Sequence, residues 1–599
     1  MKSLISINRQ LLAVLPPSAR RFLLRYAILS SLLSLIDVVA LGLLAIVMSS
    51  IITGSPVNLG PFGRIDEVSH YITVLAVFCT LVIIKSGLNI LLLRYATSRF
   101  ASHEVAIGDR LLAAYMRAPW VDRLKRNSAE LVRSVDSGVS LTVSGVLMPS
   151  MGLAGEIVSV IAVVSVLFVS NWITAVTAII YLGLIALLLS RGISKRAVAN
   201  GRRNRQFSFR TVRLLTEAVG ALKEVTLRGA SPDVEKAVHN NRIHSSKARA
   251  LAIFLGQVPR FVLEAGLIGG FMLVGGVGLL TSPSGVDPVT NALAAVALFG
   301  VAGFRIIPSL TRFQAILSMV HSNSPFAEQV LADIKESEAS AKDQEEPDQS
   351  ELPQGVPDVV LKDVSFTYPG AETPALSGVT MTIPSGSRVA VVGSSGAGKS
   401  TLIDLLLGLL LPSSGQVLVG GVPMRAVLHS WRSRVGYVPQ EVSLFDASIA
   451  QNVALTWDPE QVDEDRVRRA LERAQMLETV EKRPDGILGA VGERGMALSG
   501  GQRQRLGIAR GLYADPAVLV MDEATSALDT ATEAAVTQAV RNLTGSVTTI
   551  TVAHRLSTIR DSDVVFFFAD GKLAAQGTFA EVIAQMPDFA EQAALAGLT

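Results

Sequence analysis

The sequence predicts two different domains in one chain: an α-helical domain that crosses a membrane six times, and an α/β domain of the P-loop type. Three observations favour this fold class. Long apolar stretches are confined to the first half, the two halves differ in charge, and a glycine-rich phosphate-binding pattern lies in the second half. Residues 1–350 carry 34 basic and 23 acidic residues (net +11), and residues 351–599 carry 20 and 28 (net −8).

The composition excludes several classes of protein. Of the 599 residues 18% are charged and 49% hydrophobic, and the mean hydropathy is +0.43. These values exclude a disordered chain, a collagen-like repeat and a basic nucleic-acid-binding protein. The single cysteine, Cys79, excludes a disulfide scaffold and a cysteine-based zinc site, and we expect it to be a small buried apolar residue.

Six stretches are long enough to span a membrane. A helix needs about 20 mostly apolar residues to cross the roughly 30 Å hydrocarbon core of a bilayer. The stretches are 22–53, 71–96, 142–169, 171–190, 251–280 and 289–322. The first is too long for a signal peptide and lacks a small-residue cleavage site, so we expect it to be retained.

The basic residues predict the orientation of these spans, because connections rich in Lys and Arg stay in the cytoplasm. Residues 1–26 hold five of them, 97–141 seven and 191–250 fourteen, whereas 54–70 holds one and 281–288 none. We therefore expect both termini, both long connections and the second domain in the cytoplasm.

The two long connections are predicted to be helices that continue out of the membrane, since they contain few Gly or Pro. One break in each, near 118–120 and 229–232, should mark the tip of a helical hairpin. Separate soluble inserts are the alternative. Residues 333–353 contain a run of acids and two prolines, so we place an acidic linker there, between a membrane domain at 1–332 and a nucleotide domain at 354–599.

A phosphate-binding loop is predicted between an apolar run at 387–392 and a helical run at 402–411. In order, the loop reads Gly393, Ser394, Ser395, Gly396, Ala397, Gly398, Lys399, Ser400 and Thr401. Backbone N–H groups of such a loop close around phosphate oxygens, and the following helix N-terminus favours negative charge. Lys399 should reach the β- and γ-phosphates of ATP, and Ser400 should bind Mg²⁺.

A second apolar run, 517–521, ends in Asp522 and Glu523. An acid at the end of a buried strand beside a P-loop is placed to hold the Mg²⁺ shell. Glu523 is the candidate to orient or deprotonate the attacking water. Without the P-loop, such an acidic pair would more often be a solvated strand end.

The segment Leu498-Ser499-Gly500-Gly501-Gln502 resembles the signature of ATP-binding cassette (ABC) proteins. Other positions that match motifs of this family are Tyr368 (the aromatic that stacks on adenine), Gln440 (the Q-loop glutamine, near Mg²⁺ and the catalytic water), Asp529 (the D-loop) and His554 (the switch histidine). Residues 492–495 are similar to an exporter-specific segment. With six preceding spans, the resemblance covers nearly the whole chain. It implies an ABC exporter half-transporter, with one membrane domain fused to one cassette.

The resemblance also implies a dimer, because in this family each ATP lies between the P-loop of one cassette and the signature of another. The chain has one P-loop, so its partner should be a second copy or a related half-transporter. ATP binding would close the cassettes, and the tips near 117–124 and 228–234 would act as coupling helices that move the membrane helices. An ATP-gated channel or sensor is the competing class, and the six spans exclude a soluble ABC ATPase that acts on ribosomes or DNA.

Ionisable residues inside the predicted spans are the candidates for cargo recognition, since such residues are paired or line a path. They are Asp37, Lys85, Glu156, Arg260, Glu264 and Arg305. Arg260 and Glu264 are spaced to pair along one helix face. An acid such as Asp37, Glu156 or Glu264, or a phosphate of the cargo, should partner Arg305.

The segments 222–228, 259–264 and 304–310 resemble bacterial flippases of lipid-linked oligosaccharides. This resemblance implies the bacterial inner membrane and an anionic, amphipathic cargo, a polyprenyl-pyrophosphate-linked glycan, recognised by Arg260 and Arg305. Drugs, peptides and simple lipids are the alternative cargos, and no nucleic-acid partner is expected.

Overall fold

The computed structural model describes residues 2–53, 57–58, 64–65, 68–124, 128–282, 287–342, 348, 350–524, 530–552 and 559–595. They form two compact units. One comprises residues 1–118 and 122–341, and the other comprises residues 119–121 and 342–599.

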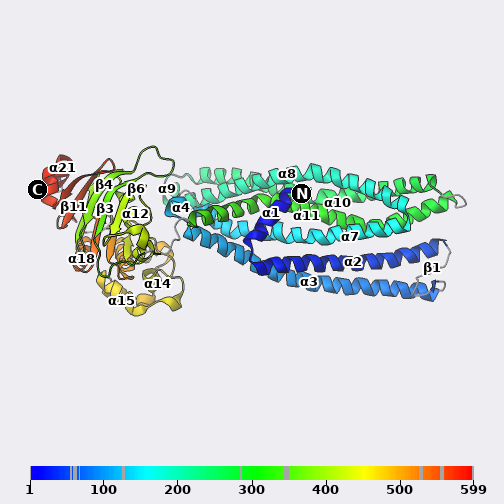
Figure 1. Cartoon of the computed structure of the whole chain (residues 1–599), viewed down its shortest axis with the longest axis horizontal. Helices are drawn as coiled ribbons and strands as arrows, with labels where there is room; N and C mark the ends of the chain where they lie inside the picture. The colour runs from blue at the N-terminus through cyan, green and yellow to red at the C-terminus, as the bar shows by residue number, and fades with distance from the viewer. Residues whose placement is uncertain are drawn as a thin grey trace. The chain divides into compact units, whose positions relative to one another are not determined.

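The first unit is a bundle of long helices that run side by side (Figure 1). Its helices are α1 (Lys2–Val14), α2 (Pro17–Thr53), α3 (Val68–Arg117), α5 (Ser128–Arg133), α6 (Val139–Thr142), α7 (Met148–Ser170), α8 (Trp172–Gly220), α9 (Leu222–Leu227), α10 (Ser231–Leu280) and α11 (Pro288–Lys342). The π-helical turns η2 (Ser134–Gly138) and η3 (Val143–Leu147) join α5, α6 and α7 into one long helix. Short strands β1 (Val57–Asn58) and β2 (Arg64–Ile65) pair between α2 and α3, and α4 (Trp120–Leu124) follows α3.

Five helices in the described part of the chain are long and apolar enough to cross a membrane, and they cover predicted spans two to six. The first predicted span lies in α2, a helix of 37 residues, and its membrane crossing stays a prediction. α8 has 49 residues and α10 has 50. At about 1.5 Å per residue these helices measure roughly 75 Å, more than twice the hydrocarbon core of a bilayer. They therefore extend well beyond it, as the sequence predicts.

Both expected hairpin tips are present as breaks between helices. α3 ends at Arg117 and α4 begins at Trp120. The second tip contains the short α9, and the chain turns at Gly229, whose φ is +63°, before α10 begins. Neither connection forms a separate soluble insert.

Two expectations are wrong. Cys79 is exposed on α3 rather than buried, on a helix whose apolar side chains, such as Ile83, also face outward. The acidic segment at 333–353 is not a linker from its first residue, because α11 continues to Lys342. Ile334 and Ser337 are buried on the inner face of α11, and this packing keeps the acid-rich end helical.

The second unit contains two sheets. The six-stranded sheet has the order β12-β11-β5-β10-β9-β8, and the four-stranded antiparallel sheet has the order β4-β3-β6-β7. Their strands are β3 (Val359–Phe366), β4 (Leu376–Ile383), β5 (Arg388–Gly393), β6 (Ser414–Val419), β7 (Val422–Pro423), β8 (Val435–Val438), β9 (Val518–Asp522), β10 (Thr548–Val552), β11 (Val564–Ala569) and β12 (Lys572–Gly577). Five strands of the larger sheet run parallel, and β12 is antiparallel to β11.

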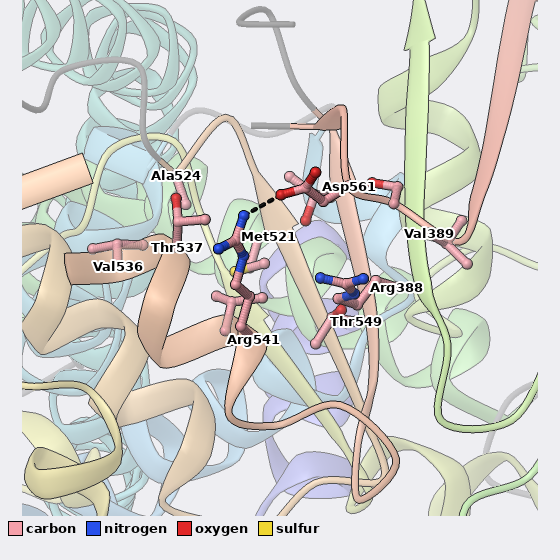
Figure 2. Close-up of a pocket in the computed structure, with 12 residues that line it drawn as sticks. Arg388, Val389, Met521, Ala524, Val536, Thr537, Arg541, Thr549 and Asp561 are labelled. Carbon is pink, nitrogen blue, oxygen red and sulfur yellow. Dashed lines mark hydrogen bonds and ion pairs between the residues drawn. The ribbon is translucent and has the colours of Figure 1, made fainter. Parts of the chain in front are cut away.

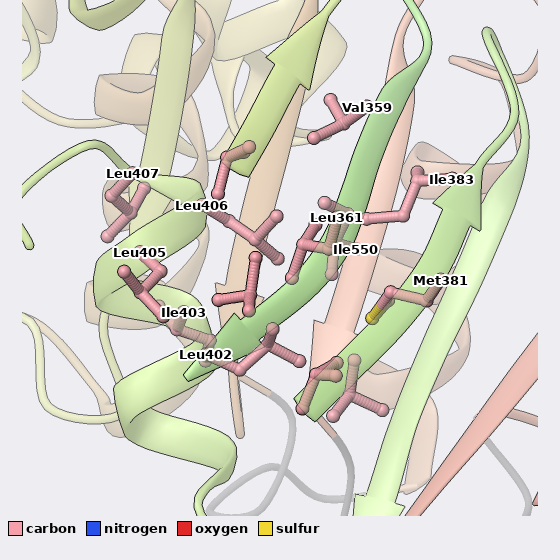
Figure 3. Packing of buried hydrophobic residues seen from close by; sticks show 14 of the residues in the cluster. Val359, Leu361, Met381, Ile383, Leu402, Ile403, Leu405, Leu406, Leu407 and Ile550 are labelled. Carbon is pink, nitrogen blue, oxygen red and sulfur yellow. The ribbon is translucent and has the colours of Figure 1, made fainter. Parts of the chain in front are cut away.

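Helices cover these sheets. They are α12 (Lys399–Leu406), α13 (Leu428–Arg432), α14 (Ile449–Ala454), α15 (Glu464–Arg473), α16 (Leu477–Glu481), α17 (Gly500–Leu512), α18 (Thr530–Arg541), α20 (Phe579–Gln585) and α21 (Pro587–Leu595). Figure 3 shows Leu402 and Leu406 of α12 pointing toward Leu361 of β3 and Ile550 of β10. These residues belong to one buried apolar cluster, against which Trp120 and Val121 also pack. This cluster fixes the start of α12, and with it the loop that precedes the helix.

Candidate functional site

The predicted nucleotide residues follow strands that are neighbours in the larger sheet. β5 leads into the glycine-rich loop, β9 ends at Asp522, and β8 leads to Gln440. In an open parallel sheet, ligands bind beyond the carboxyl ends of the strands. The order β5-β10-β9-β8 therefore gathers these segments at one edge of the sheet.

The glycine-rich loop has a backbone that side chains would disturb. Gly393, Gly396 and Gly398 have φ values of +146°, +82° and +95°. A Cβ at Gly393 would lie 2.2 Å from the Phe568 carbonyl oxygen, and one at Gly398 would lie 2.7 Å from that of Ala375. The loop thus exposes its backbone directly before α12, where N–H groups and the helix dipole favour an anion. This cradle fits a nucleotide phosphate.

Lys399 opens α12 and folds back over the loop. Its Nζ donates to the carbonyl oxygens of Gly393, at 2.8 Å, and Ser394, at 2.9 Å. Burial lowers the pKa of Lys399, while the nearby carboxylates of Glu523 and Asp522 act in the opposite direction. The ammonium group is thereby held beside the loop, next to the two acids that follow β9.

Glu523 and Gln440 meet directly. Gln440 Nε2 donates to Glu523 Oε2 at 2.6 Å. The Glu523 backbone N–H donates to the Val552 carbonyl oxygen on β10 at 3.0 Å, and its φ is +49°. A non-glycine residue with positive φ is uncommon and occurs where surrounding contacts determine it. Two side chains that are 83 residues apart in the sequence thus form one polar pair at the end of β9.

Other predicted residues are placed around this centre. The Tyr368 hydroxyl lies 3.3 Å from Thr401 Oγ1, and its ring meets Phe366 edge-on at 4.9 Å between centroids. Ser499 caps α17 by accepting from the Gln502 backbone N–H, and Gln502 Oε1 accepts from the Ser499 backbone N–H at 2.9 Å. This capping box fixes the signature at the helix start, where Ser499 and Gly500 are exposed. The D-loop Asp529 and the switch histidine His554 lie outside the described residues.

Two polar residues near Asp522 were not singled out from the sequence. Burial, followed by the negative charge of Asp522, raises the pKa of Asp404 on α12 to about 6. Burial, followed by the nearby carboxylates of Asp522 and Asp404, raises the pKa of Tyr437 on β8 to about 12. The signals were an Asp at an i+4 position from Ser400 and a Tyr on the strand beside β9.

A small cavity of about 40 Å³ lies between α18 and strands β5, β9 and β10 (Figure 2). Arg541 and Asp561 form an ion pair at its edge, and Val536 and Met521 line it. Among the described residues, none that is predicted to bind nucleotide lines this cavity.

In the first unit, the intramembrane charges are arranged in two groups. Arg260 Nε donates to Glu264 Oε1 at 2.8 Å, which is the predicted pairing along α10. Glu156 binds Arg312 on α11, with Arg312 Nε at 2.8 Å from Glu156 Oε1, and Ser309 Oγ also donates to the Glu156 carboxylate. Two of the three acids expected to partner Arg305 are thus engaged with other arginines. The Asp37 side chain lies outside the described residues.

Arg312 was missed by the sequence reasoning although it lies inside the predicted span 289–322. Its spacing of seven residues from Arg305, two helical turns, was the available signal. Arg305 and Lys85 both lie within electrostatic range of Arg312, and Lys85 also lies within range of Glu156. Positive side chains from α3 and α11 therefore gather around one acid from α7.

Comparison with known proteins agrees with this architecture. A family model described as ABC transporter matches residues 376–526. The chain is 33% identical over 432 residues to the ATP-dependent lipid A-core flippase of Francisella novicida, with 71% of each chain covered. The chain belongs to the ABC exporter family. This ABC exporter is a half-transporter, with one membrane domain fused to one ATPase domain, and its ATP hydrolysis is coupled to transport.

Two further similarities concern the length and the fold of this ABC exporter. It is 29% identical over 512 residues to the ATP-dependent lipid A-core flippase of Cupriavidus pinatubonensis, covering 80% of this chain and 81% of that protein. The structure of a bacterial Atm1-family ABC exporter with ATP bound superimposes with a TM-score of 0.75 at 23% identity, covering 97% of this chain and 99% of that chain. The latter similarity confirms the fold alone.

Proposed function

We propose that the protein uses ATP hydrolysis to move an anionic, amphipathic lipid outward across a bacterial inner membrane, as a dimer. The observation that carries the cargo class is the group formed by Lys85, Glu156, Arg305 and Arg312. Export of amphipathic molecules by ATP hydrolysis follows from the family. The negative charge of the cargo, the identity of the membrane and the dimeric state are parts of the proposal.

The intramembrane group favours an anionic headgroup because it contains three cations and one carboxylate. Arg312 is bound by Glu156, and Arg305 and Lys85 lie within electrostatic range of that ion pair. Charged side chains are costly inside a membrane and persist there when they pair or line a path. Guanidinium groups bind phosphate oxygens through two parallel hydrogen bonds. A phosphate or pyrophosphate headgroup would therefore complement this site.

A polyprenyl-pyrophosphate-linked oligosaccharide is the specific cargo that we propose. The sequence segments around Arg260 and Arg305 support it. The two relatives described above are named ATP-dependent lipid A-core flippases, which supports a lipid cargo in general. Arg260 is bound by Glu264, so a cargo headgroup would have to compete with this ion pair at Arg260. Drugs, peptides and simple lipids are the competing cargos.

In the cassette, the roles we propose follow the geometry of the site. The loop 393–398 and Lys399 would bind the phosphates of ATP, and Tyr368 would stack on adenine. Gln440 orients the Glu523 carboxylate, which would accept a proton from the attacking water. Mg²⁺, held by Ser400, Asp522 and Gln440, would neutralise charge on the phosphates. His554 and Asp529 keep the roles that the family resemblance gives them.

Dimerisation would complete each site, with the exposed signature at Ser499 facing the P-loop of the partner. Complementation between two inactive chains tests this arrangement. Lys399→Ala and Ser499→Arg should each abolish hydrolysis in a homodimer. A mixed dimer that contains one of each should recover at most one complete site and therefore about half of the activity. Hydrolysis at the full rate by a purified monomer would contradict the shared site.

The cargo is tested by ATPase stimulation in lipid vesicles, with lipid-linked glycan, a cationic drug and a peptide compared at equal concentration. We expect stimulation by the lipid-linked glycan alone, and its loss in Arg305→Ala while basal hydrolysis continues. Arg305→Lys should also lose most of it, because an ammonium group lacks the planar fork. The matched control is Arg213→Ala, which removes an exposed arginine paired with Glu217 on the same domain. A well-folded Arg305→Ala protein with the parent response would refute the cargo site.

A further inference from the structure

The segment around Gln440 lies against α17, the helix that begins at the signature. β8 ends at Val438, and Pro439 and Gln440 follow it directly. α17 starts at Gly500 and has 13 residues. At about 1.5 Å per residue it is roughly 20 Å long. A single helix therefore carries the signature at its start and reaches the segment around Gln440 along its side.

Gln504 on α17 holds the residue directly before Gln440. Its Nε2 donates to the Pro439 carbonyl oxygen at 3.3 Å, and Gln504 is only 7% exposed. Proline has no backbone N–H, so this carbonyl is the one polar backbone group at residue 439. A buried amide without a hydrogen-bond partner is costly. The hydrogen bond therefore restrains the peptide that leads into Gln440.

α17 also holds the residues that follow Gln440. A Cβ at Gly507 would lie 2.4 Å from Val442 Cγ2, so the backbone of the helix packs directly on Val442. One turn further along, Arg510 Nη1 donates to the Ser443 carbonyl oxygen at 2.9 Å. The segment is thus attached to one helix on both sides of Gln440.

These contacts matter because the Gln440 side chain itself is exposed, and its amide donates to Glu523 Oε2 at 2.6 Å. An exposed side chain takes its position mainly from the backbone that bears it. Gln504, Gly507 and Arg510 are spaced three residues apart, so they share one side of α17. This side of the helix sets the backbone on which Gln440 stands.

We propose that Gln504 is a positioning residue for ATP hydrolysis, whose amide fixes the Pro439 carbonyl and thereby places Gln440 against Glu523. This inference rests on the proposed roles of Gln440 and Glu523. Gln504 acts through the backbone, and the binding of the phosphates is assigned to the P-loop. Loss of its hydrogen bond should therefore lower kcat for ATP hydrolysis more than it raises KM for ATP.

The test uses Gln504→Met in the full-length protein in lipid vesicles, because this substitution removes the donor and keeps a side chain of similar length. A neutral hydrogen bond contributes about two- to tenfold in an equilibrium, so we expect kcat to fall about two- to tenfold. Steady-state hydrolysis against ATP concentration gives kcat and KM separately.

A double-mutant cycle with Gln440→Ala distinguishes positioning from a general structural effect. The residual hydrolysis of Gln440→Ala is measured by release of labelled phosphate. In this background Gln504→Met should change kcat by less than about twofold, because the side chain that Gln504 positions is gone. A loss of structure elsewhere would lower kcat by the same factor in both backgrounds.

Arg505→Met is the matched control. Arg505 lies on the same helix and also donates to a backbone carbonyl oxygen, that of Gln475, at 2.8 Å. Gln475 does not belong to the segment around Gln440, so Arg505→Met should keep the parent kcat. If Gln504→Met does not fold, Gln504→Ala takes its place in the cycle, because alanine cannot clash and favours a helix.

Two results would overturn the inference: the parent kcat in a folded Gln504 variant, or an equal loss of kcat with and without the Gln440 side chain. Gln440→Ala by itself separates the two levels of the argument. If it hydrolyses ATP at the parent rate, the proposed role of Gln440 fails, whatever the Gln504 variants do.

Discussion

Gly201 on α8 marks a close approach between two long helices of the membrane domain, α8 and α11. A Cβ at this position would lie 2.0 Å from the carbonyl oxygen of Ser322 on α11, and real side chains essentially never come within 3.0 Å. The obstacle is backbone in the middle of a helix, so no side-chain rotation can relieve it. Gly201→Ala must therefore move α8 and α11 apart by about 1 Å, since tightly packed interiors leave no slack.

The energetic cost follows from this geometry. Overpacking a well-packed interior costs about 1–3 kcal/mol, and a backbone clash belongs near the upper limit. Alanine is the better helix former by about 1 kcal/mol, which offsets part of the cost. The net destabilisation should be about 2 kcal/mol. At about 2 °C per kcal/mol for a large domain, the apparent melting temperature should fall by about 4 °C.

Gly192→Ala is the matched control on the same helix, because nothing lies within 4 Å of a Cβ at that position. The free energy of unfolding of Gly192→Ala should equal that of the parent or exceed it by up to about 1 kcal/mol. The assay is thermal unfolding of the detergent-solubilised protein at a fixed scan rate, because unfolding of large proteins is often irreversible. If both variants unfold at the parent temperature, α8 and α11 do not pack backbone to backbone at Gly201.

Three other predictions concern the cassette and the helix ends. Glu523→Gln should bind ATP but lower steady-state hydrolysis at least about 100-fold, measured by phosphate release, because the water loses its base; near-normal turnover would remove Glu523 from catalysis. Asp404→Asn should raise the melting temperature more at pH 8 than at pH 5.5. The folded pKa of Asp404 is raised to about 6, so the folded protein loses stability as pH rises toward that value and the carboxylate ionises, and asparagine avoids this loss. An equal effect at both pH values would contradict the raised pKa. Arg110→Ala and Glu338→Ala should each destabilise the protein by up to about 1 kcal/mol, because these half-exposed side chains bind each other at 2.6 Å. The two losses of stability should not add in the double variant, since either substitution already breaks the ion pair. Additive losses in thermal unfolding would argue against the pair.

Hydrophobic patterning predicted much of the fold because a membrane imposes one simple requirement on a helix. Stretches of about 20 apolar residues identify spans regardless of what they pack against. The end of α11 was predicted wrongly because composition alone cannot show which face of a helix is buried. Glu338 belongs to an acidic run, but Ile334 and Ser337 pack inward and Arg110 binds the glutamate, so the helix continues.

The sequence by itself predicted the order of the domains, the hairpin tips, the P-loop and a set of candidate nucleotide-site residues, because these predictions depend on local spacing and on fixed motif chemistry. Tertiary structure alone decided which distant side chains meet. Gln440 reaches Glu523 because β8 and β9 are adjacent, and Arg312 rather than Arg305 binds Glu156 because of how α7 and α11 pack. Such pairings depend on strand order and helix rotation, which result from the packing of the whole domain and which no local pattern encodes.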